Sequence, residues 1–212
     1  GFSTGTDGDT FYINQVDKKY ISWAWKAGGA PSAGKQRVDN SSSETTLSSG
    51  THYSNITNMK QSVNSTGKFS ITQYTGGSTT SWFKHGLGDT TPDMFIIKSL
   101  GSTDNWMVWH KDLSNTRSNW LYLNTNGSEG NNGDSAWNST APDSDGKIHL
   151  GNTSLVNTNH SYICYAWKAV SGVSAFGTYS GSSSGGTVYT TDDGTSTGSG
   201  GFKPRFVVLK SI

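Results

Sequence analysis

The sequence is short of cysteine, of charge and of long apolar runs. Its 212 residues include one cysteine, Cys164, so an internal disulfide framework is excluded, and stability must come from packing or oligomerisation. The formal net charge is +1 and the three arginines do not cluster. A nucleic-acid binder needs a clustered basic surface, so we expect no nucleic-acid partner. No run approaches the ~20 apolar residues of a membrane span, so we expect no membrane insertion.

Aromatic residues are plentiful against this polar background. Hydrophobic residues make up 31% and charged residues 15%, while 8 Trp, 9 Tyr and 8 Phe are present. A disordered chain is poor in aromatics and rich in net charge, so the composition indicates a folded domain with many turns. Apolar residues nowhere recur with a helical period, which favours an all-β fold.

One octapeptide is written almost identically twice, as "YISWAWKA" at 20–27 and as "YICYAWKA" at 162–169. Large and small side chains alternate in both copies, which is the period of a strand. Cys164 stands where Ser22 stands, so we interpret it as a small buried residue rather than a nucleophile. We expect Trp23, Trp25 and Trp167 to fill the core or a contact between subunits.

Two further segments repeat in the same order. "FSITQYTGG" at 69–77 matches "SAFGTYSGS" at 174–182, and both read as a strand that enters a glycine turn. "TPDMFIIKS" at 91–99 matches "KPRFVVLKS" at 203–211, with the same spacing between proline and lysine. Its continuously apolar centre predicts a strand that is buried on both faces, with proline tolerated at the strand start.

These matches predict one unit over residues 1–212. It would consist of a half-repeat at 1–99 with a polar insertion at 28–68, a middle block at 100–147, and a half-repeat at 148–212. Short strands, frequent turn residues and no crossover helices indicate an antiparallel β-sandwich of jelly-roll or concanavalin-like type. Because the sequence stops inside a predicted strand, we expect the natural polypeptide to continue beyond Ile212.

The ordered motifs "YxxWAWKAGG", "FSITQYTG", "NWMVWHKDL", "YICYAWKAV" and "GFKPRFVVLK" resemble a repetitive β-sandwich domain of virion structural proteins from tailed bacteriophages, of the marine and cyanobacterial type. The resemblance covers residues 20–27 and 69–212. The domain itself is similar to a concanavalin-like or laminin-G-like sandwich.

The resemblance implies a non-enzymatic structural protein on the virion surface, in a tail fibre, a capsid fibre or a decoration. Its expected partners are further copies of itself or other virion proteins. Two alternatives remain open, a carbohydrate-recognition module that adsorbs the phage to a host-surface glycan, and a secreted bacterial adhesin. Fold analogy alone does not decide between them.

Patterns typical of enzymes are weak. Residues 181–185 satisfy G-x-S-x-G, but the nucleophile elbow needs a strand-to-helix turn and a histidine later in the chain, and His160 is the last histidine. A glycosidase needs two carboxylates at a set separation. The two glutamates, Glu44 and Glu129, lie apart in loop-like sequence. The five histidines lack zinc-type spacing, and we interpret His85 and His110 as strand caps or as partners of loop backbone.

Two kinds of binding site remain as candidates. Asp143 and Asp145, in "DSDG", could supply oxygen ligands to calcium, although Asp-x-Asp-Gly is also an ordinary turn. Trp82, Trp120 and Trp137 lie in polar contexts, where an exposed indole stacks well on a sugar ring. The alternative for these rings is a place in the core or in a contact between subunits, and for Trp137 we favour that alternative.

Overall fold

The computed structural model describes residues 17, 19, 20, 22, 24–131, 135–192 and 194–211. In these residues the fold is all-β, as predicted, and contains no α-helix. The strands are β1 (Lys35–Val38), β2 (Glu44–Thr46), β3 (Tyr53–Ser54), β4 (Thr57–Asn64), β5 (Phe69–Thr75), β6 (Ser81–Lys84), β7 (Met94–Ser99), β8 (Met107–His110), β9 (Asn119–Tyr122), β10 (Gly130–Asn131), β11 (Lys147–Leu150) and β12 (Ser161–Trp167).

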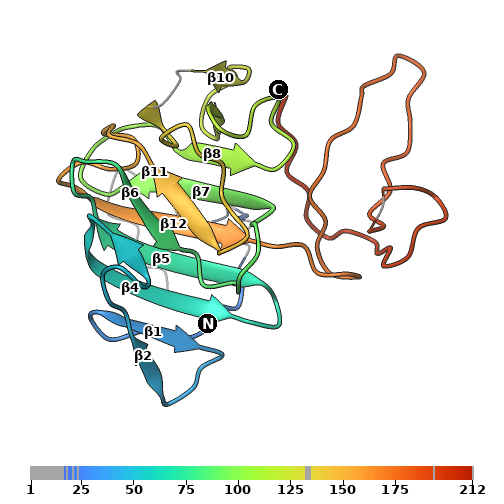
Figure 1. The fold of residues 1–212 in the computed structure, drawn as a ribbon. Coiled ribbons are helices and arrows are strands. Elements are labelled where there is room, and N and C mark those ends of the chain that lie inside the picture. The colour runs from blue at the N-terminus through green and yellow to red at the C-terminus, as the bar shows by residue number, and fades with distance from the viewer. Residues whose placement is uncertain are drawn as a thin grey trace.

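The strands form two sheets that face each other. The large sheet has the order β10-β9-β8-β7-β12-β5-β4-β1-β2, and the small sheet has the order β11-β6-β3. Figure 1 shows the small sheet lying across one face of the large one, an arrangement consistent with a β-sandwich. Pairing is antiparallel except between β1 and β4, which run parallel, so the expectation of a purely antiparallel fold is wrong at that pair. The chain passes through β2 and β3 before β4, and this long connection permits the parallel pair.

The second copy of the repeated octapeptide forms β12, at the centre of the large sheet. It pairs along its whole length with β5, from Ser161 opposite Thr75 to Trp167 opposite Phe69. On its other edge it pairs with β7. Cys164 is 1% exposed on the face toward the small sheet, which confirms its interpretation as a small buried residue. Burial raises the pKa of its thiol, so the reactive thiolate is disfavoured.

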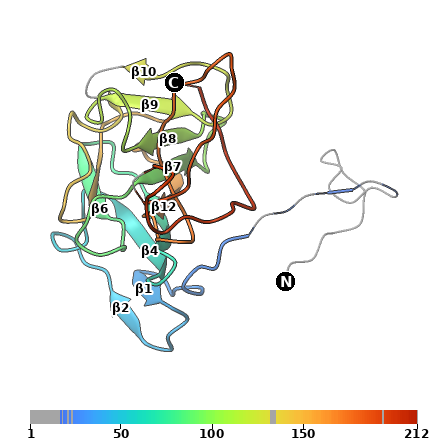
Figure 2. The same ribbon diagram turned by 90° about the vertical axis from the view of Figure 1, so that its right-hand side faces the viewer.

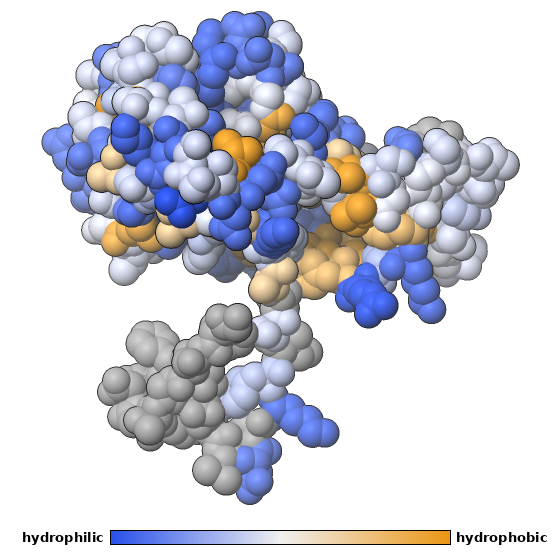
Figure 3. All heavy atoms as spheres, turned by 90° about the horizontal axis from the view of Figure 1, so that it is seen from below, coloured by the Kyte–Doolittle hydropathy of each residue, from blue (hydrophilic) through white to orange (hydrophobic). Residues whose placement is uncertain are grey.

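The large aromatic side chains of the repeat lie on the outer face of the large sheet. Trp167 is half-buried there and stacks on Phe69, with 5.1 Å between ring centroids. Trp25 is 46% exposed and meets the edge of Trp167 at 5.9 Å. A place in the core is therefore wrong for both rings, the alternative of a contact between subunits stays a prediction, and Trp23 lies outside the described residues. Figure 3 shows hydrophobic residues gathered where residues 170–211 meet the part of the chain that forms the two sheets.

Rings from other strands fill the core instead. Tyr74 of β5 meets Phe83 of β6 across the two sheets at 5.1 Å. Phe95 of β7 stacks on Trp109 at 5.3 Å, and its ring meets the edge of Trp137 at 5.1 Å. Because these rings occupy the space between the sheets, β12 presents only the small side chains of Cys164 and Ala166 beside Tyr162. The prediction that the first apolar strand is buried on both faces is confirmed, since Phe95 and Ile97 are 0% and Ile96 is 8% exposed.

Residues 28–68, predicted as a polar insertion, contribute strands to the fold and side chains to the core. They contain β1 to β4, and β4 pairs with β5 while it buries Met59 and Val63. Gly28 packs directly on this strand, because a Cβ built on it would lie 2.0 Å from the carbonyl oxygen of Val63. The polar composition concealed this role because β4 also buries a glutamine, Gln61, which bonds to Thr72 and to the backbone of Lys84.

The two predicted halves are not equivalent. Residues 28–169 form the two sheets and are called the body. Residues 170–211, the C-terminal segment, contain no strand among the described residues, so the strands expected at 174–182 and 204–211 are wrong. Figure 2 shows this segment running beside the body without joining either sheet.

A buried carboxylate holds the end of β12 against the start of β7. Asp93 is 4% exposed, and its carboxylate accepts hydrogen bonds from the Ala169 amide and, at 3.2 Å, from the Lys168 ammonium. The ammonium of Lys111, directly after β8, lies 3.5 Å from the Asp93 carboxylate. Burial works to raise the pKa of Asp93, but these hydrogen bonds and charges hold that pKa below its ordinary value.

We expect Phe95→Ala to lower the free energy of unfolding of the chain by about 3–5 kcal/mol, because it removes a fully buried ring that contacts two tryptophans. Urea denaturation followed by tryptophan fluorescence measures the change. Leu100→Ala is the control, since Leu100 is 55% exposed and its loss should change stability by less than about 0.5 kcal/mol. Equal effects of the two substitutions would contradict this account of the core.

Candidate functional site

Two of the three tryptophans proposed for sugar binding are core residues. Trp137 is 1% exposed, and its indole N–H donates to the carbonyl of Asn119 at 2.8 Å. Trp120, in β9, is 7% exposed. The expectation of exposed indole faces is therefore wrong for both, because the rings were needed to fill the space beside β7 and β8. For Trp137 the alternative that we favoured, a place in the core, is confirmed.

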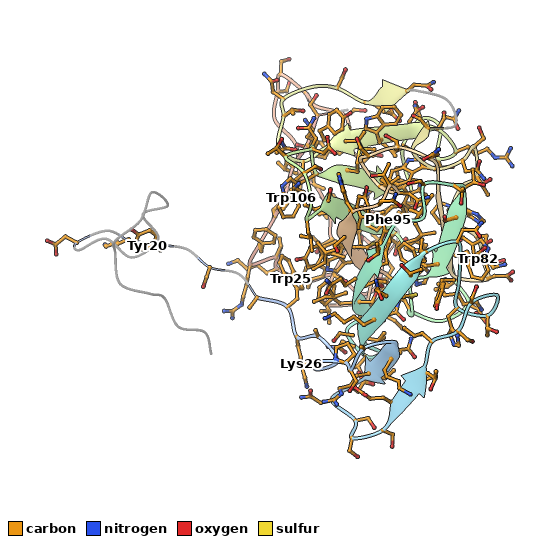
Figure 4. All side chains as sticks on the ribbon, turned by 90° about the vertical axis from the view of Figure 1, so that its left-hand side faces the viewer. Tyr20, Trp25, Lys26, Trp82, Phe95 and Trp106 are labelled. Carbon is orange, nitrogen blue, oxygen red and sulfur yellow. The ribbon has the colours of Figure 1, made fainter. Side chains whose placement is uncertain are left out.

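Trp82 is different, because it lies on the outward face of the small sheet. The β6 side chains alternate between buried and half-buried, and Trp82 takes a half-buried position. Its register partner on β11 is His149. The ammonium of Lys147 sits over the indole, 5.2 Å from the ring centroid, in a cation–π contact. Figure 4 shows Trp82 on the opposite side of the body from Trp25, with Phe95 between them.

Asp143 and Asp145 lie beside this tryptophan, in the turn that enters β11. One oxygen of Asp143 accepts the backbone N–H groups of Asp145 and Lys147, both at 3.0 Å. Its other oxygen lies 3.2 Å from Nε2 of His149. Partial burial works to raise the pKa of Asp143, but the Lys147 amide and the His149 ring hold that pKa below its ordinary value.

The structure thus brings together three of the five predicted site residues on one surface, called the β6–β11 face. It comprises the following side chains: Trp82, Lys84, Asp143, Asp145, Lys147 and His149. Each cation has an acidic neighbour, with Lys147 at 3.1 Å from Asp145 and Lys84 at 3.1 Å from Asp89. Exposed ion pairs of this kind contribute little to stability, so a ligand can replace them at small cost. The face therefore combines an indole with hydrogen-bonding groups that suit a polar, uncharged ligand such as a sugar.

The Asp143–Asp145 pair is built as a turn rather than as a calcium cage. Both oxygens of Asp143 already receive hydrogen bonds, and Gly146 closes the turn with its N–H on the carbonyl of Asp143 at 3.1 Å. Gly146 has a φ of 75°, which glycine adopts without strain. No group of three or more His, Cys, Asp or Glu residues that could hold a metal ion occurs in the part of the chain that the structure describes.

A pocket of about 180 Å³ opens next to the β6–β11 face, between the large and small sheets. It is smaller than the ~300–1,000 Å³ of pockets that enclose whole ligands, so it fits only part of one. Gln61 at its base is satisfied internally, since its amide bonds Gln36 at 2.6 Å and Thr72 at 2.8 Å. The pocket is lined by Gln36, Leu47, His52, Met59, Gln61, Lys84, Gly86, Gly88 and Asp89.

The family model of a domain of unknown function, DUF7483, matches residues 1–212, the whole chain. The chain belongs to the DUF7483 family. No curated protein and no solved structure matches it significantly. Within the described residues, no helix has the length and apolar character needed to cross a membrane.

In this DUF7483 chain a buried histidine supports the β6–β11 face from below. His85 follows β6 and is 0% exposed. Its Nε2–H donates to the carbonyl of Thr90 at 2.8 Å, and its Nδ1 accepts the N–H of Leu87 at 3.0 Å. The His85 backbone N–H also bonds Gly146, in the turn that carries the two aspartates. The prediction that His85 and His110 bond loop backbone is confirmed, since Nδ1 of His110 accepts the N–H of Asp112.

The glutamates considered for catalysis have structural partners. Glu44 receives hydrogen bonds from Ser32, which lower its pKa, whereas a general acid needs a raised pKa. It also pairs with Arg37 at 3.0 Å. Glu129 accepts the N–H of Ser114 at 2.7 Å and the side-chain amide of Asn119 at 3.0 Å. Residues 181–185 lie in a loop and not at a strand-to-helix turn.

The sequence reasoning missed Lys84, Lys147 and His149 as members of the face. The signal that could have found them is the alternation along two short strands, which places Trp82 with Lys84 and Lys147 with His149. What the sequence does not contain is the pairing of β6 with β11, since the two strands are far apart in the chain.

We expect the chain to lose stability as the pH falls below about 6.5, and His85→Gln to flatten this dependence. Burial lowers the pKa of His85 from its ordinary 6.5, so between the two pKa values the unfolded chain binds a proton and the folded chain does not. Protonation therefore favours the unfolded state as the pH falls. The contribution is complete above pH 6.5 and is lost as the pH falls toward the folded-state pKa.

Urea midpoints between pH 7.5 and 5 measure this effect. His52→Gln, at a partly exposed histidine on the pocket rim, is the matched control for the loss of an imidazole ring. A slope that His85→Gln leaves unchanged would show that another group is responsible.

Proposed function

We propose that the chain is a non-enzymatic structural component of the virion surface of a tailed bacteriophage, built on a jelly-roll or concanavalin-like sandwich. One observation carries the proposal. The segments that the chain repeats are those that form β5, β7 and β12, the adjacent central strands of the large sheet. No residue of the β6–β11 face belongs to these three strands. Repetition therefore preserves a scaffold rather than a chemical site, as is expected of a building block.

The engagement of potential catalytic groups supports the non-enzymatic part of the proposal. Among the described residues Asp93 is the most buried carboxylate, and its partners are structural: the Ala169 amide and the ammonium groups of Lys111 and Lys168. Cys164 is buried with a raised pKa, and His85 is bonded on both ring nitrogens. Asp93 and His85 thus hold loops and strands together, and Cys164 packs in the core.

Electron microscopy of phage particles that carry this gene tests the proposal, with an antibody raised against the purified chain. We expect label on the capsid, on the tail shaft or on fibres. A phage deleted for the gene serves as the control and should be unlabelled. Particles that remain unlabelled, with label on bacterial cells instead, would overturn the virion assignment in favour of a secreted adhesin.

A second candidate function is recognition of a host-surface carbohydrate by the β6–β11 face. The observation that favours it is the half-buried Trp82, which lies outward among Asp143, Asp145 and His149. An indole covers the apolar face of a sugar ring, while carboxylates and imidazole bond its hydroxyls. Lys147 covers the indole and would have to swing away, which its exposed pairing with Asp145 permits.

We expect Trp82→Ala to weaken adsorption of the labelled chain to host cells at least about tenfold, equivalent to ~1.4 kcal/mol. Adsorption isotherms with fluorescent protein measure it. Trp106→Ala is the matched control, because Trp106 is likewise a half-buried indole and lies on the opposite side of the body (Figure 4). If both variants adsorb as the wild type does, or both fail alike, the β6–β11 face is not the recognition site.

A further inference from the structure

The pocket beside the β6–β11 face opens within reach of Trp82. Lys84 belongs to both, since it lines the pocket and follows Trp82 by two residues on β6. Two residues of a strand span ~6.6 Å, a distance that one sugar unit covers. His52, another lining residue, lies across from Lys84, because its carbonyl accepts the Lys84 N–H at 2.8 Å. A ligand that lies over Trp82 therefore reaches the pocket with a group on its edge.

The floor of the pocket is apolar. Met59 and Leu47 both line it, and they are 1% and 6% exposed in the folded chain. Water in the pocket forms no hydrogen bond with either side chain, so an apolar group of a ligand is favoured at this place. The small volume of the pocket limits that group to the size of a substituent rather than a whole ring.

The wall of the pocket carries two side chains with hydrogen-bonding capacity to spare. Nδ1 of His52 accepts the N–H of Ser48 at 3.1 Å, so the neutral ring carries its proton on Nε2, which is available as a donor. Gln36 donates one N–H to Gln61 at 2.6 Å, and its carbonyl oxygen has no hydrogen-bond partner among the residues that the structure describes. Gln61 is already engaged at both ends of its amide, so polar recognition falls to His52 and Gln36.

The rim of the pocket carries two opposite charges. The ammonium of Lys84 lies 3.1 Å from the carboxylate of Asp89, and both residues line the pocket. The Asp89 side chain is 77% exposed, so the pair is solvated and weak. It can bond the hydroxyl groups of a ligand without favouring a net charge of either sign. The rim therefore suits a neutral ligand.

The loop on one side of the pocket is fixed by buried contacts. His85 bonds the carbonyl of Thr90 and the N–H of Leu87 with its two ring nitrogens. Gly86 packs so closely on Gln61 that a Cβ built on it would lie 2.5 Å from the amide oxygen. The pocket is thus formed before a ligand arrives, which reduces the cost of ordering side chains on binding.

We propose that this pocket binds the acetamido group of a neutral amino sugar, N-acetylglucosamine or a close relative, while the sugar ring lies on Trp82. The group matches each part of the pocket. Its methyl covers Met59 and Leu47, its carbonyl accepts the Nε2–H of His52, and its N–H donates to the carbonyl of Gln36. This inference rests on the second candidate function, recognition of carbohydrate by the β6–β11 face, and names the class of sugar.

A sugar with a hydroxyl group in place of the acetamido group leaves the pocket unfilled. The hydroxyl is too short to cover the apolar floor, and it cannot serve the donor of His52 and the acceptor of Gln36 at the same time. A site that hydrogen-bonds a particular substituent discriminates strongly against the analogue that lacks it. The pocket therefore predicts a preference between two sugars that Trp82 alone would not distinguish.

The test follows the methyl groups of the three methionines by NMR, in the purified, methyl-labelled chain. Met59 lines the pocket, whereas Met94 and Met107 do not. Chitotriose, three linked N-acetylglucosamine units, is the probe, and cellotriose, with hydroxyl groups in place of the acetamido groups, is the matched ligand. We expect chitotriose to shift the Met59 signal alone and to bind at least about tenfold more tightly than cellotriose. Met59→Leu assigns the signal.

His52→Phe keeps a planar ring and removes the donor. We expect it to weaken chitotriose binding about fivefold, the effect of one lost hydrogen bond, and to leave cellotriose binding unchanged. His110→Phe is the matched control, because Nδ1 of His110 likewise accepts a backbone N–H and the residue lines neither the pocket nor the face. Unchanged signals of Met94 and Met107 report that each variant is folded.

Three results would overturn the proposal: a Met59 signal that chitotriose leaves in place, equal affinities for the two trisaccharides, or a Met59 shift with sialyllactose alone. Sialyllactose carries its acetamido group beside a carboxylate, so that last result would indicate an acidic sugar.

Failure of this inference is distinguishable from failure of carbohydrate recognition by the face. If both trisaccharides bind, Trp82→Ala abolishes their binding and the Met59 signal stays in place, the face binds sugar and only the pocket assignment falls. If chitotriose shifts Met59 while Trp82→Ala leaves adsorption to host cells unchanged, the pocket binds its sugar and only the role in host recognition falls.

Discussion

The pairing of β12 on both of its edges is the constraint on which the rest of the structure depends. Through it, the strands β5, β4, β1 and β2 on one side join the strands β7, β8, β9 and β10 on the other. Its inner face is restricted to small residues such as Cys164 and Ala166, because rings from β5, β6 and β7 occupy the space between the sheets. Asp93 then fixes the end of β12, because its buried carboxylate accepts hydrogen bonds from the Lys168 ammonium and the Ala169 amide, which directly follow that strand.

Much of this fold is visible in the sequence, and the reasons for the failures are physical. Alternation and β-branched runs located β5, β7 and β12, because local side-chain pattern reports burial. The same reasoning placed Trp25 and Trp167 in the core or in a contact between subunits, since alternation tells two faces apart but does not say which face is inward. It also described residues 28–68 only as a polar insertion, because β4 buries Gln61 and Ser62 beside Met59. It expected strands in the C-terminal segment, because a strand sequence alone does not supply the neighbours with which it pairs.

The candidate site was predictable in part for a similar reason. Polar context separated Trp82, Trp120 and Trp137 from the repeats, yet only Trp82 lies outward, because Trp120 and Trp137 are the rings that fill the core around β7. Asp143 and Asp145 were recognised as a pair of oxygen donors. Their proximity to Trp82 depends on β6 pairing with β11, a contact between distant segments that no local pattern encodes.

The position of β12 has a consequence for how the chain is made. It is the last strand of the body in sequence and the middle strand of the large sheet in space, so neither side of that sheet is complete until residue 167 has left the ribosome. At ~5–20 residues per second, the interval between the synthesis of β5 and that of β12 lasts roughly 5–20 s. During this interval the edges of β5 and β7 are open to strands from neighbouring nascent chains. Polysomes that make many copies at once would therefore bring the sheet's own strand into competition with identical strands from adjacent chains.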